Sequence, residues 1–220
     1  KHGQIHPQFK GFMDRFGYYG IFLIEPDKGR VVYSVAKEID FGTSLFNGPH
    51  SGTNLARVAK EAMNLRFGEY AFADFEAYAP SFGAPTAFVA TPVFAGPTMI
   101  GVLAFQMPAD HINAIMTSNE AWADVGLGAS GETYLVAPDL LLRNQSRFLI
   151  EDRDQYLEMI RAIGTPEDIV QQIDGLDNSI GLQTVDTEGT RAALAGESGE
   201  RIFPDYRGVS VLSSYKPLDL

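Results

Sequence analysis

The stretch that decides the fold runs from residue 71 to residue 108 and reads AFADFEAYAPSFGAP, TAFVATPVF, AGPT and MIGVLAFQMP in turn. Its two apolar runs, Thr86–Phe94 and Met99–Met107, flank a turn that carries Gly96 and Pro97. This pattern is typical of a β-hairpin. Neither run alternates cleanly between apolar and polar residues, so both faces of the hairpin are expected to be covered. The sequence therefore predicts central strands of a sheet that is backed by helices.

A polar and aromatic segment precedes this hairpin, and prolines interrupt it at Pro80 and Pro85. Because proline cannot donate to a central ladder, the segment is predicted to be an edge or a loop that lies against the sheet. It carries the carboxylate of Asp74, the phenol of Tyr78 and the hydroxyl of Ser81. A concave sheet face closed by such a loop has the features of a small-ligand pocket.

The candidate pocket residues also have simpler interpretations. Asp74 can cap a turn, and Tyr78 can pack in the core with its hydroxyl bonded to the backbone. Lys37 shares a face with Tyr33 if their strand is regular, where it could bind a ligand carboxylate or simply face solvent. Phe88 can equally be a core residue. The predicted ligand-binding residues are Tyr33, Lys37, Asp74, Tyr78, Ser81, Phe88 and Gln106.

Composition excludes several classes of function. The net charge of -11 over 220 residues argues against binding a nucleic-acid backbone or lying flat on anionic lipid. The absence of cysteine excludes disulfides, thiolate zinc sites and cysteine nucleophiles. No apolar run of about 18 residues occurs, so no transmembrane helix is expected within the chain. The ends resemble those of an excised fragment, from which flanking membrane helices could have been removed.

No catalytic or metal-binding motif emerges. His2 and His6 are four residues apart, but Gly3 and Pro7 interrupt the helix that would bring them together for a metal. The glycines Gly126, Gly128 and Gly131 match a dinucleotide fingerprint by spacing, yet they precede a predicted strand instead of following one. Without a nucleophile–base pair or a cofactor motif, the chain is predicted not to be an enzyme and to need no cofactor.

The order of elements predicts an α+β fold made of two similar modules. Strands are expected at 20–24 and 30–37, and a helix at 54–65 that is capped by Ser51 or Thr53. A related plan begins again about 110 residues later, where Tyr134 corresponds to Phe22. The predicted modules span residues 1–122 and 123–220. Further elements are expected at 109–116, 132–136, 140–144, 155–163, 166–173, 187–195, 200–203 and 209–215.

Several short motifs, taken in order, resemble double Cache (tandem PAS-like) sensor domains. They are GIFLI at 20–24, VVYS at 31–34, KE at 37–38, DFGTSL at 40–45, the 74–81 segment, and GVLAFQ at 101–106. The segments GLGASGETYLV at 126–136 and DYRG at 205–208 resemble the membrane-proximal module of that family. The resemblance implies two tandem modules, each with a central antiparallel sheet flanked by helices.

The resemblance also implies a function. Such domains lie outside the cytoplasmic membrane in bacterial chemoreceptors, histidine kinases and cyclases, where the distal module binds a small molecule and the full receptor is a homodimer. Two departures argue against a plain amino acid as the ligand: the family's Arg-x-Trp-Tyr element is missing, and the position of an ammonium-binding Asp is occupied by Gln106. The alternative function is a structural or partner-binding ectodomain without a small-molecule ligand.

Overall fold

The computed structural model describes residues 2–218. The chain divides into two compact units, Lys1–His111 and Ile112–Leu220. This division comes earlier than the boundary at 122/123 that the sequence predicted. Both units mix helices with antiparallel strands, so the predicted α+β class is confirmed.

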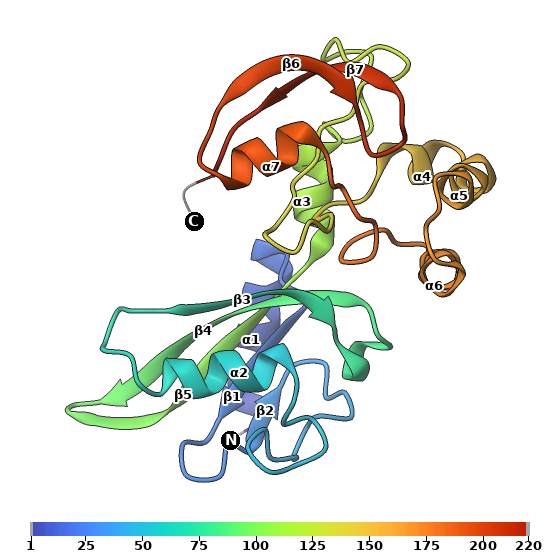
Figure 1. The fold of residues 1–220 in the computed structure, drawn as a ribbon. Helices are drawn as coiled ribbons and strands as arrows, with labels where there is room; N and C mark the ends of the chain where they lie inside the picture. The colour runs from blue at the N-terminus through green and yellow to red at the C-terminus, as the bar shows by residue number, and fades with distance from the viewer. Residues whose placement is uncertain (1, 219–220) are drawn as a thin grey trace. The chain divides into compact units, whose positions relative to one another are not determined.

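The first unit is built on a five-stranded antiparallel sheet with the order β2-β1-β5-β4-β3 (Figure 1). Its strands are β1 (Gly20–Ile24), β2 (Val31–Ser34), β3 (Ala71–Ala77), β4 (Pro85–Ala95) and β5 (Thr98–Met107). The predicted hairpin is β4–β5, and both of its strands lie inside the sheet. The segment that holds Asp74 and Tyr78 forms the edge strand β3 and the short helix η1 (Ala79–Ser81), as its prolines indicate.

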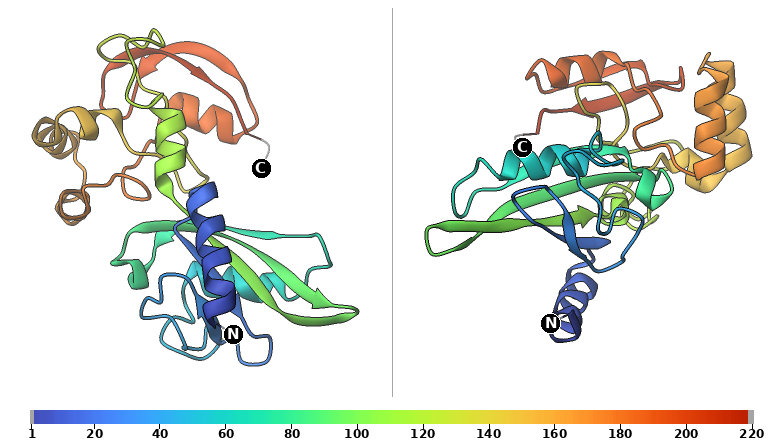
Figure 2. Two further views of the ribbon diagram at one scale, coloured as in Figure 1. Left: turned by 180° about the vertical axis from the view of Figure 1, so that it is seen from behind. Right: turned by 90° about the horizontal axis from the view of Figure 1, so that it is seen from below.

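Helices cover the two faces of this sheet (Figures 1 and 2). Helix α2 (Asn54–Ala62) packs on one face, and its N-cap is Thr53, whose side chain accepts a hydrogen bond from the N–H of Ala56. Helix α1 (His2–Phe16) lies on the opposite face and contains Pro7. Both faces of the central strands are therefore covered along part of their length, although Ile100 in β5 is 55% exposed.

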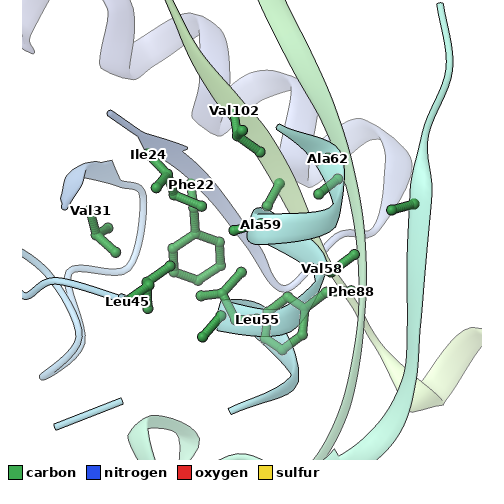
Figure 3. Packing of buried hydrophobic residues seen from close by; sticks show 14 of the residues in the cluster. Phe22, Ile24, Val31, Leu45, Leu55, Val58, Ala59, Ala62, Phe88 and Val102 are labelled. Carbon is green, nitrogen blue, oxygen red and sulfur yellow. The ribbon is translucent and has the colours of Figure 1, made fainter. Parts of the chain in front are cut away.

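The core of the first unit lies between α2 and the sheet (Figure 3). The register pairs Phe22 with Ala104, and Ala104 with Ala90, so these residues share the face that α2 covers. Leu55 and Val58 of α2 meet them there and are almost fully buried. Burying each large side chain contributes roughly 1.5–3 kcal/mol, so this layer holds the unit together.

The opposite face of the sheet packs against aromatic residues of α1. Tyr33 contacts Phe9, with 5.2 Å between ring centroids, and its hydroxyl lies 3.0 Å from Nδ1 of His6. Phe105 contacts Phe12 of α1 and Tyr18 just beyond it. This layer fixes α1 to β1, β2 and β5.

The second unit has more helix than strand and has a small sheet of its own. Its helices are α4 (Arg147–Glu151), α5 (Arg153–Ala162), α6 (Glu167–Leu176) and α7 (Glu188–Leu194), and its strands are β6 (Gly199–Pro204) and β7 (Ser210–Tyr215). Helix α7 packs on the β6–β7 hairpin (Figure 1). Helix α3 (Ala109–Met116) spans the division between the units. Among the described residues, no helix combines the length and apolar character that a membrane crossing requires.

The strands predicted at 132–136 and 140–144 are wrong, because the structure has only isolated bridges there, such as Val136 with Leu142. Two local features interrupt the ladder. Leu140 has a positive φ of 64°, which turns the chain out of extended geometry. In addition, the N–H of Leu135 donates to the side-chain Oδ1 of Asn144 at 2.7 Å instead of to a backbone carbonyl.

A buried polar network ties the second unit together around Glu132. Its carboxylate accepts hydrogen bonds from the hydroxyl of Tyr206 and the backbone N–H of Arg147, both at 2.8 Å. The Tyr206 hydroxyl also lies 2.8 Å from Oγ of Ser146. The network joins the β6–β7 turn to the start of α4. It also gives hydrogen-bond partners to polar groups that are buried in the second unit.

Candidate functional site

Five polar side chains gather at one end of the first unit's sheet, on the face that α2 covers. Three different segments supply them. Gln106 lies near the end of β5, Tyr78 and Ser81 lie in the turn after β3, and Glu38 and Asp40 lie in the loop after β2. We call these five residues the polar cluster.

A chain of hydrogen bonds runs through the polar cluster. Nε2 of Gln106 donates to Oγ of Ser81 at 3.0 Å, and that hydroxyl donates to Oε2 of Glu38 at 2.9 Å. The hydroxyl of Tyr78 donates to Oδ2 of Asp40 at 2.5 Å. The hydroxyls of Tyr78 and Ser81 and the amide nitrogen of Gln106 therefore each donate to an acceptor within the cluster.

Two acceptors of the cluster have no partner. Oδ1 of Asp40 and Oε1 of Gln106 are buried without a hydrogen bond to any described residue. Asp40 is 0% exposed and Gln106 is 2% exposed. A buried acceptor without a partner costs about 1–3 kcal/mol, and more when it is charged. Since native folds pair nearly all of their buried polar groups, these two oxygens make the cluster a candidate site.

Burial raises the pKa of the Asp40 carboxyl, and the Tyr78 hydroxyl and the nearby charge of His50 partly oppose that rise. The backbone N–H groups of Asp40 and Phe41 lie close to the carboxylate and also favour its charged form, although neither forms a well-directed hydrogen bond with Oδ1. Burial likewise raises the pKa of Tyr78, and the charge of Asp40 adds to the effect, so this phenol remains protonated and acts as a donor.

Glu38 is the second carboxyl of the cluster and is less buried than Asp40. Burial raises its pKa, the charge of Asp40 raises it further, and the hydrogen bond from Ser81 opposes both. The hydroxyl of Tyr19 lies 3.5 Å from Oε1 of Glu38. A carboxyl whose pKa a neighbouring carboxyl raises in this way would be stabilised in its charged form by a nearby positive charge.

Aromatic side chains and a closely packed glycine surround the polar cluster. The rings of Tyr78 and Phe88 meet edge to face with 5.0 Å between centroids, and Phe88 pairs with Gln106 across the strands. Gly20 pairs with Gln106 from the other side, and a Cβ added there would lie 2.7 Å from Oε1 of Gln106. The missing side chain at Gly20 therefore leaves the space that the Gln106 amide occupies.

The structure brings together four of the residues predicted for the pocket, Tyr78, Ser81, Phe88 and Gln106. Tyr33 lies on the opposite face of the sheet, against α1, because it pairs with Leu23 one residue out of phase with Phe22. Lys37 lies beyond the end of β2 with a positive φ of 54° and an exposed side chain, so it does not share a regular strand face with Tyr33. Oδ1 of Asp74 accepts from the N–H of Phe75 at 2.7 Å, within edge strand β3.

Sequence reasoning missed Glu38 and Asp40, which supply both carboxylates of the cluster. They lie in an irregular loop, where neither helical nor strand periodicity tells an inward residue from an outward one. The available signal was the order of residue types: an acidic residue at 38 and another at 40, directly after a strand and before the turn at 41–45.

The second unit contains a cavity of about 360 Å³ between the end of α5, the start of α6 and the 181–184 loop. Apolar side chains of Leu141, Ile163 and Ile169 form much of its wall. The amide of Gln183, which also lines it, is satisfied, since Oε1 accepts from Tyr156 and Nε2 donates to the carbonyl of Thr184. Without an unpartnered polar group, this cavity is a weaker candidate site than the polar cluster.

Comparison with known proteins finds no matching family model and no matching curated protein. Solved structures do match. The sensor domain of the Vibrio cholerae histidine kinase DctB has 15% identity and a TM-score of 0.38, over 49% of this chain and 38% of that one. The ligand-binding domain of the Pseudomonas aeruginosa chemoreceptor PctC, in complex with GABA, has 16% identity and a TM-score of 0.45, over 66% and 57%. That of the Campylobacter jejuni chemoreceptor Tlp3, in complex with L-valine, has 10% identity and a TM-score of 0.44, over 70% and 53%.

These matches correct one prediction. The sequence was interpreted as unfavourable to a plain amino acid, but the PctC and Tlp3 domains were solved with GABA and L-valine, so that exclusion is withdrawn. The chain spans between 38% and 57% of the lengths of these three structures. In fold, this chain is similar to the sensor and ligand-binding domains of a bacterial histidine kinase and of chemoreceptors.

Proposed function

We propose that this chain is the extracytoplasmic sensing part of a transmembrane receptor and that it binds a small molecule at the polar cluster. The single observation that carries the proposal is the pair of buried acceptors, Oδ1 of Asp40 and Oε1 of Gln106, which have no partner among the described residues. A ligand that donates hydrogen bonds to these two oxygens would remove the free-energy cost of leaving them unpaired. That gain would add to the free energy of binding.

On this proposal, the turn after β3 is where the ligand enters. It closes on itself, because the N–H of Tyr78 donates to the carbonyl of Ala84 and the N–H of Gly83 donates back to the carbonyl of Tyr78. At its tip Phe82 has a positive φ of 57° and a side chain that is 93% exposed. A bulky residue in this conformation is strained, and such strain tends to occur at functional sites. We propose that the turn moves as one unit to admit a ligand to Ser81 and Tyr78, which would break their hydrogen bonds to Glu38 and Asp40.

The cluster also touches the segments through which a signal could leave the sheet. Gln106 precedes α3 by three residues, and its carbonyl accepts from the N–H of Tyr19, which follows α1. Farther along, the ring of His111 in α3 packs against Gly17 at the end of α1. A ligand that prefers one position of Gln106 would bias this junction by no more than that preference.

A thermal-shift screen with a broad metabolite library tests the proposal, since a ligand specific to the folded state raises the melting temperature. The matched variants are Tyr78→Phe, which removes the cluster hydroxyl, and Tyr70→Phe, which removes a hydroxyl from a side chain that is 70% exposed. Hits are expected to weaken in the first variant and to persist in the second. Hits that Tyr78→Phe leaves unchanged, or a screen without any hit, would refute binding at this site.

A further inference from the structure

We infer that residues 117–121 form a strained turn with two conformations, and that helix α3 lengthens toward Trp122 when the turn is released. Gln145 and Arg147, which we call the clamp, hold the turn in its strained form. These conformations belong to the chain itself and do not depend on a ligand, so they go beyond the proposed function. The backbone geometry, the local sequence and the contacts of the clamp lead to this two-state element.

The backbone of the strained turn is left-handed over three consecutive residues that carry side chains. The φ angles are 52° at Ser118, 54° at Asn119 and 65° at Glu120. L-residues visit this region singly, because the Cβ atom comes too close to the following carbonyl oxygen. The N–H of Glu120 donates to the carbonyl of Thr117 at 2.9 Å, and that of Ala121 donates to the carbonyl of Ser118 at 3.2 Å. The chain therefore stores backbone strain directly after α3.

Ordinary helix termination explains only the first of these three residues. The N–H of Asn119 donates to the carbonyl of Ala114 at 2.8 Å, and the N–H of Ser118 donates to the carbonyl of Ile115 at 3.2 Å. This is the pattern of a Schellman cap, in which one residue, usually glycine, is left-handed. Ser118 takes that position. Asn119 and Glu120 lie beyond it with exposed side chains, so the cap itself does not require their left-handed geometry.

The sequence of the turn is also compatible with a right-handed helix. No glycine or proline occurs from residue 109 to residue 125, although these residues usually end helices. Glu120 and Ala121 are good helix formers. In a longer α3, Trp122 would follow Ile115 by seven residues and share a helix face with it, and Ile115 is 76% exposed. Lengthening would therefore relieve the strain and align two large apolar side chains.

The clamp fixes both ends of the strained turn. On the α3 side, the backbone N–H of Gln145 donates to Oδ1 of Asn113 at 2.7 Å. On the other side, the guanidinium of Arg147 lies over the ring of Trp122, 4.7 Å from its centroid, and donates to two carbonyls of the 126–131 segment. Strained backbone persists where the surrounding structure fixes it in this way. A longer α3 requires the release of Trp122 from Arg147.

The position of the strained turn gives it a regulatory role. Helix α3 begins in the first unit and ends in the second, and the strained turn follows it directly. One state has a short α3 and a closed clamp, and the other has a long α3 and a released Trp122. A change anywhere in the chain shifts this equilibrium only by its preference for one of the two states.

The experiment uses Trp122, which is the only tryptophan of the chain and is 7% exposed. Its release shifts the fluorescence emission of the purified chain to longer wavelength and increases quenching by acrylamide. The double variant Asn119→Ala with Glu120→Ala favours right-handed helix, and Asn119→Gly with Glu120→Gly favours the left-handed turn. Asp124→Gly is the control, because this residue is exposed and has a negative φ.

The alanine pair is expected to shift the equilibrium toward the long α3 by at least about tenfold. The emission should move to longer wavelength, and the backbone carbon-13 chemical shifts of residues 118–121 should become those of a right-handed helix. The glycine pair should keep the emission of the parent chain and raise its melting temperature by about 2 °C. Asp124→Gly should change neither the emission nor the chemical shifts, and it should not raise the melting temperature.

Asn113→Ala tests the clamp, since it removes the oxygen that accepts from Gln145. It is expected to release Trp122, whereas Asn113→Asp keeps an acceptor there and should restore the emission of the parent chain. Asn113→Ala combined with the glycine pair should also restore that emission, because the turn would no longer be strained.

Three results would overturn the inference. The first is a glycine pair that is no more stable than the parent chain, since the turn would then store no strain. The second is an alanine pair with the emission of the parent chain. The third is an alanine pair in which residues 118–121 show the chemical shifts of a disordered chain, because the turn would then have unfolded without lengthening α3. If Asn113→Ala does not fold, the alanine pair decides, because Asn119 and Glu120 are exposed.

Discussion

The Ser81 hydroxyl accepts a hydrogen bond from Nε2 of Gln106 at 3.0 Å, and the two residues come from segments 25 positions apart in the chain. This contact orients the amide, and the same hydroxyl donates onward to Glu38. Through these two hydrogen bonds, Ser81 connects strand β5, which carries Gln106, to the loop that carries Glu38 and Asp40.

Replacing Ser81 with alanine should destabilise the first unit and weaken ligand binding. The change leaves a donor on Gln106 and an acceptor on Glu38 unsatisfied, at a cost of about 1–3 kcal/mol for the buried one. Urea denaturation measures the loss. The exposed Ser214→Ala in β7 is the control, and it is expected to stay within about 0.5 kcal/mol of the parent chain. Equal stability of the two variants would show that the hydrogen bonds of Ser81 do not stabilise the polar cluster.

The pH dependence of stability should contain a contribution from Glu132 in the second unit. Burial raises the pKa of this carboxyl in the folded chain above its ordinary value of 4.5. The favourable contribution is thus fully present below that ordinary value and is lost as pH rises through the folded-state pKa. Relative to Glu132→Gln, the parent chain should lose stability as pH rises above about 4.5.

The Glu132→Gln variant can keep the network, because its amide can donate to the Tyr206 hydroxyl and accept from the N–H of Arg147. Urea denaturation at several pH values gives the difference between the two chains and cancels the titration of Glu38 and Asp40. A difference that does not change with pH would contradict the raised pKa.

Phe82→Gly is expected to stabilise the first unit modestly. Phe82 has a positive φ of 57°, which costs a residue with a side chain about 1–2 kcal/mol, and its exposed ring contributes little packing. Part of the gain is offset by the greater freedom of glycine in the unfolded chain. The expected net gain is on the order of 0.5 kcal/mol by urea denaturation. A clear loss of stability would mean that the ring packs in solution and is not held exposed for a ligand.

Much of the first unit could be predicted from its sequence because local and long-range signals agree there. The β4–β5 hairpin carries turn residues between two apolar runs, and Thr53 precedes an amphipathic helix as a cap should. The strands predicted at 132–136 and 140–144 failed for the opposite reason. Apolar residues there favour strands, but the side chain of Asn144 takes the hydrogen bond that a ladder would need.

The candidate site could be predicted only in part. Tyr78, Ser81 and Gln106 belong to regular or proline-marked segments, where spacing indicates the inward face. Tyr33 lies on the face opposite to the polar cluster because it pairs with Leu23, and the sequence does not show which residue of β1 it pairs with. Asp40 could not be identified because burial of a loop carboxylate depends on Tyr78, a residue 38 positions away.

Gly20→Ala should disturb the ligand site by moving Gln106. The added Cβ would lie 2.7 Å from Oε1 of Gln106, closer than Cβ atoms normally come to another atom, and 3.1 Å from a ring carbon of Phe22, which is tighter than most such contacts. The amide must therefore rotate away from its place beside Ser81, and overpacking of this kind costs about 1–3 kcal/mol. Binding of any hit from the metabolite screen should fall by at least about tenfold, as measured by calorimetry.

The matched control is Gly11→Ala, in the interior of α1, where an added Cβ meets nothing within 4 Å. Alanine there should raise stability by roughly 0.5–1 kcal/mol, because glycine weakens a helix interior. The two variants add the same methyl group to the same unit with opposite expected effects on stability. Unchanged ligand affinity in Gly20→Ala, with the fold intact, would show that Oε1 of Gln106 does not contact the ligand.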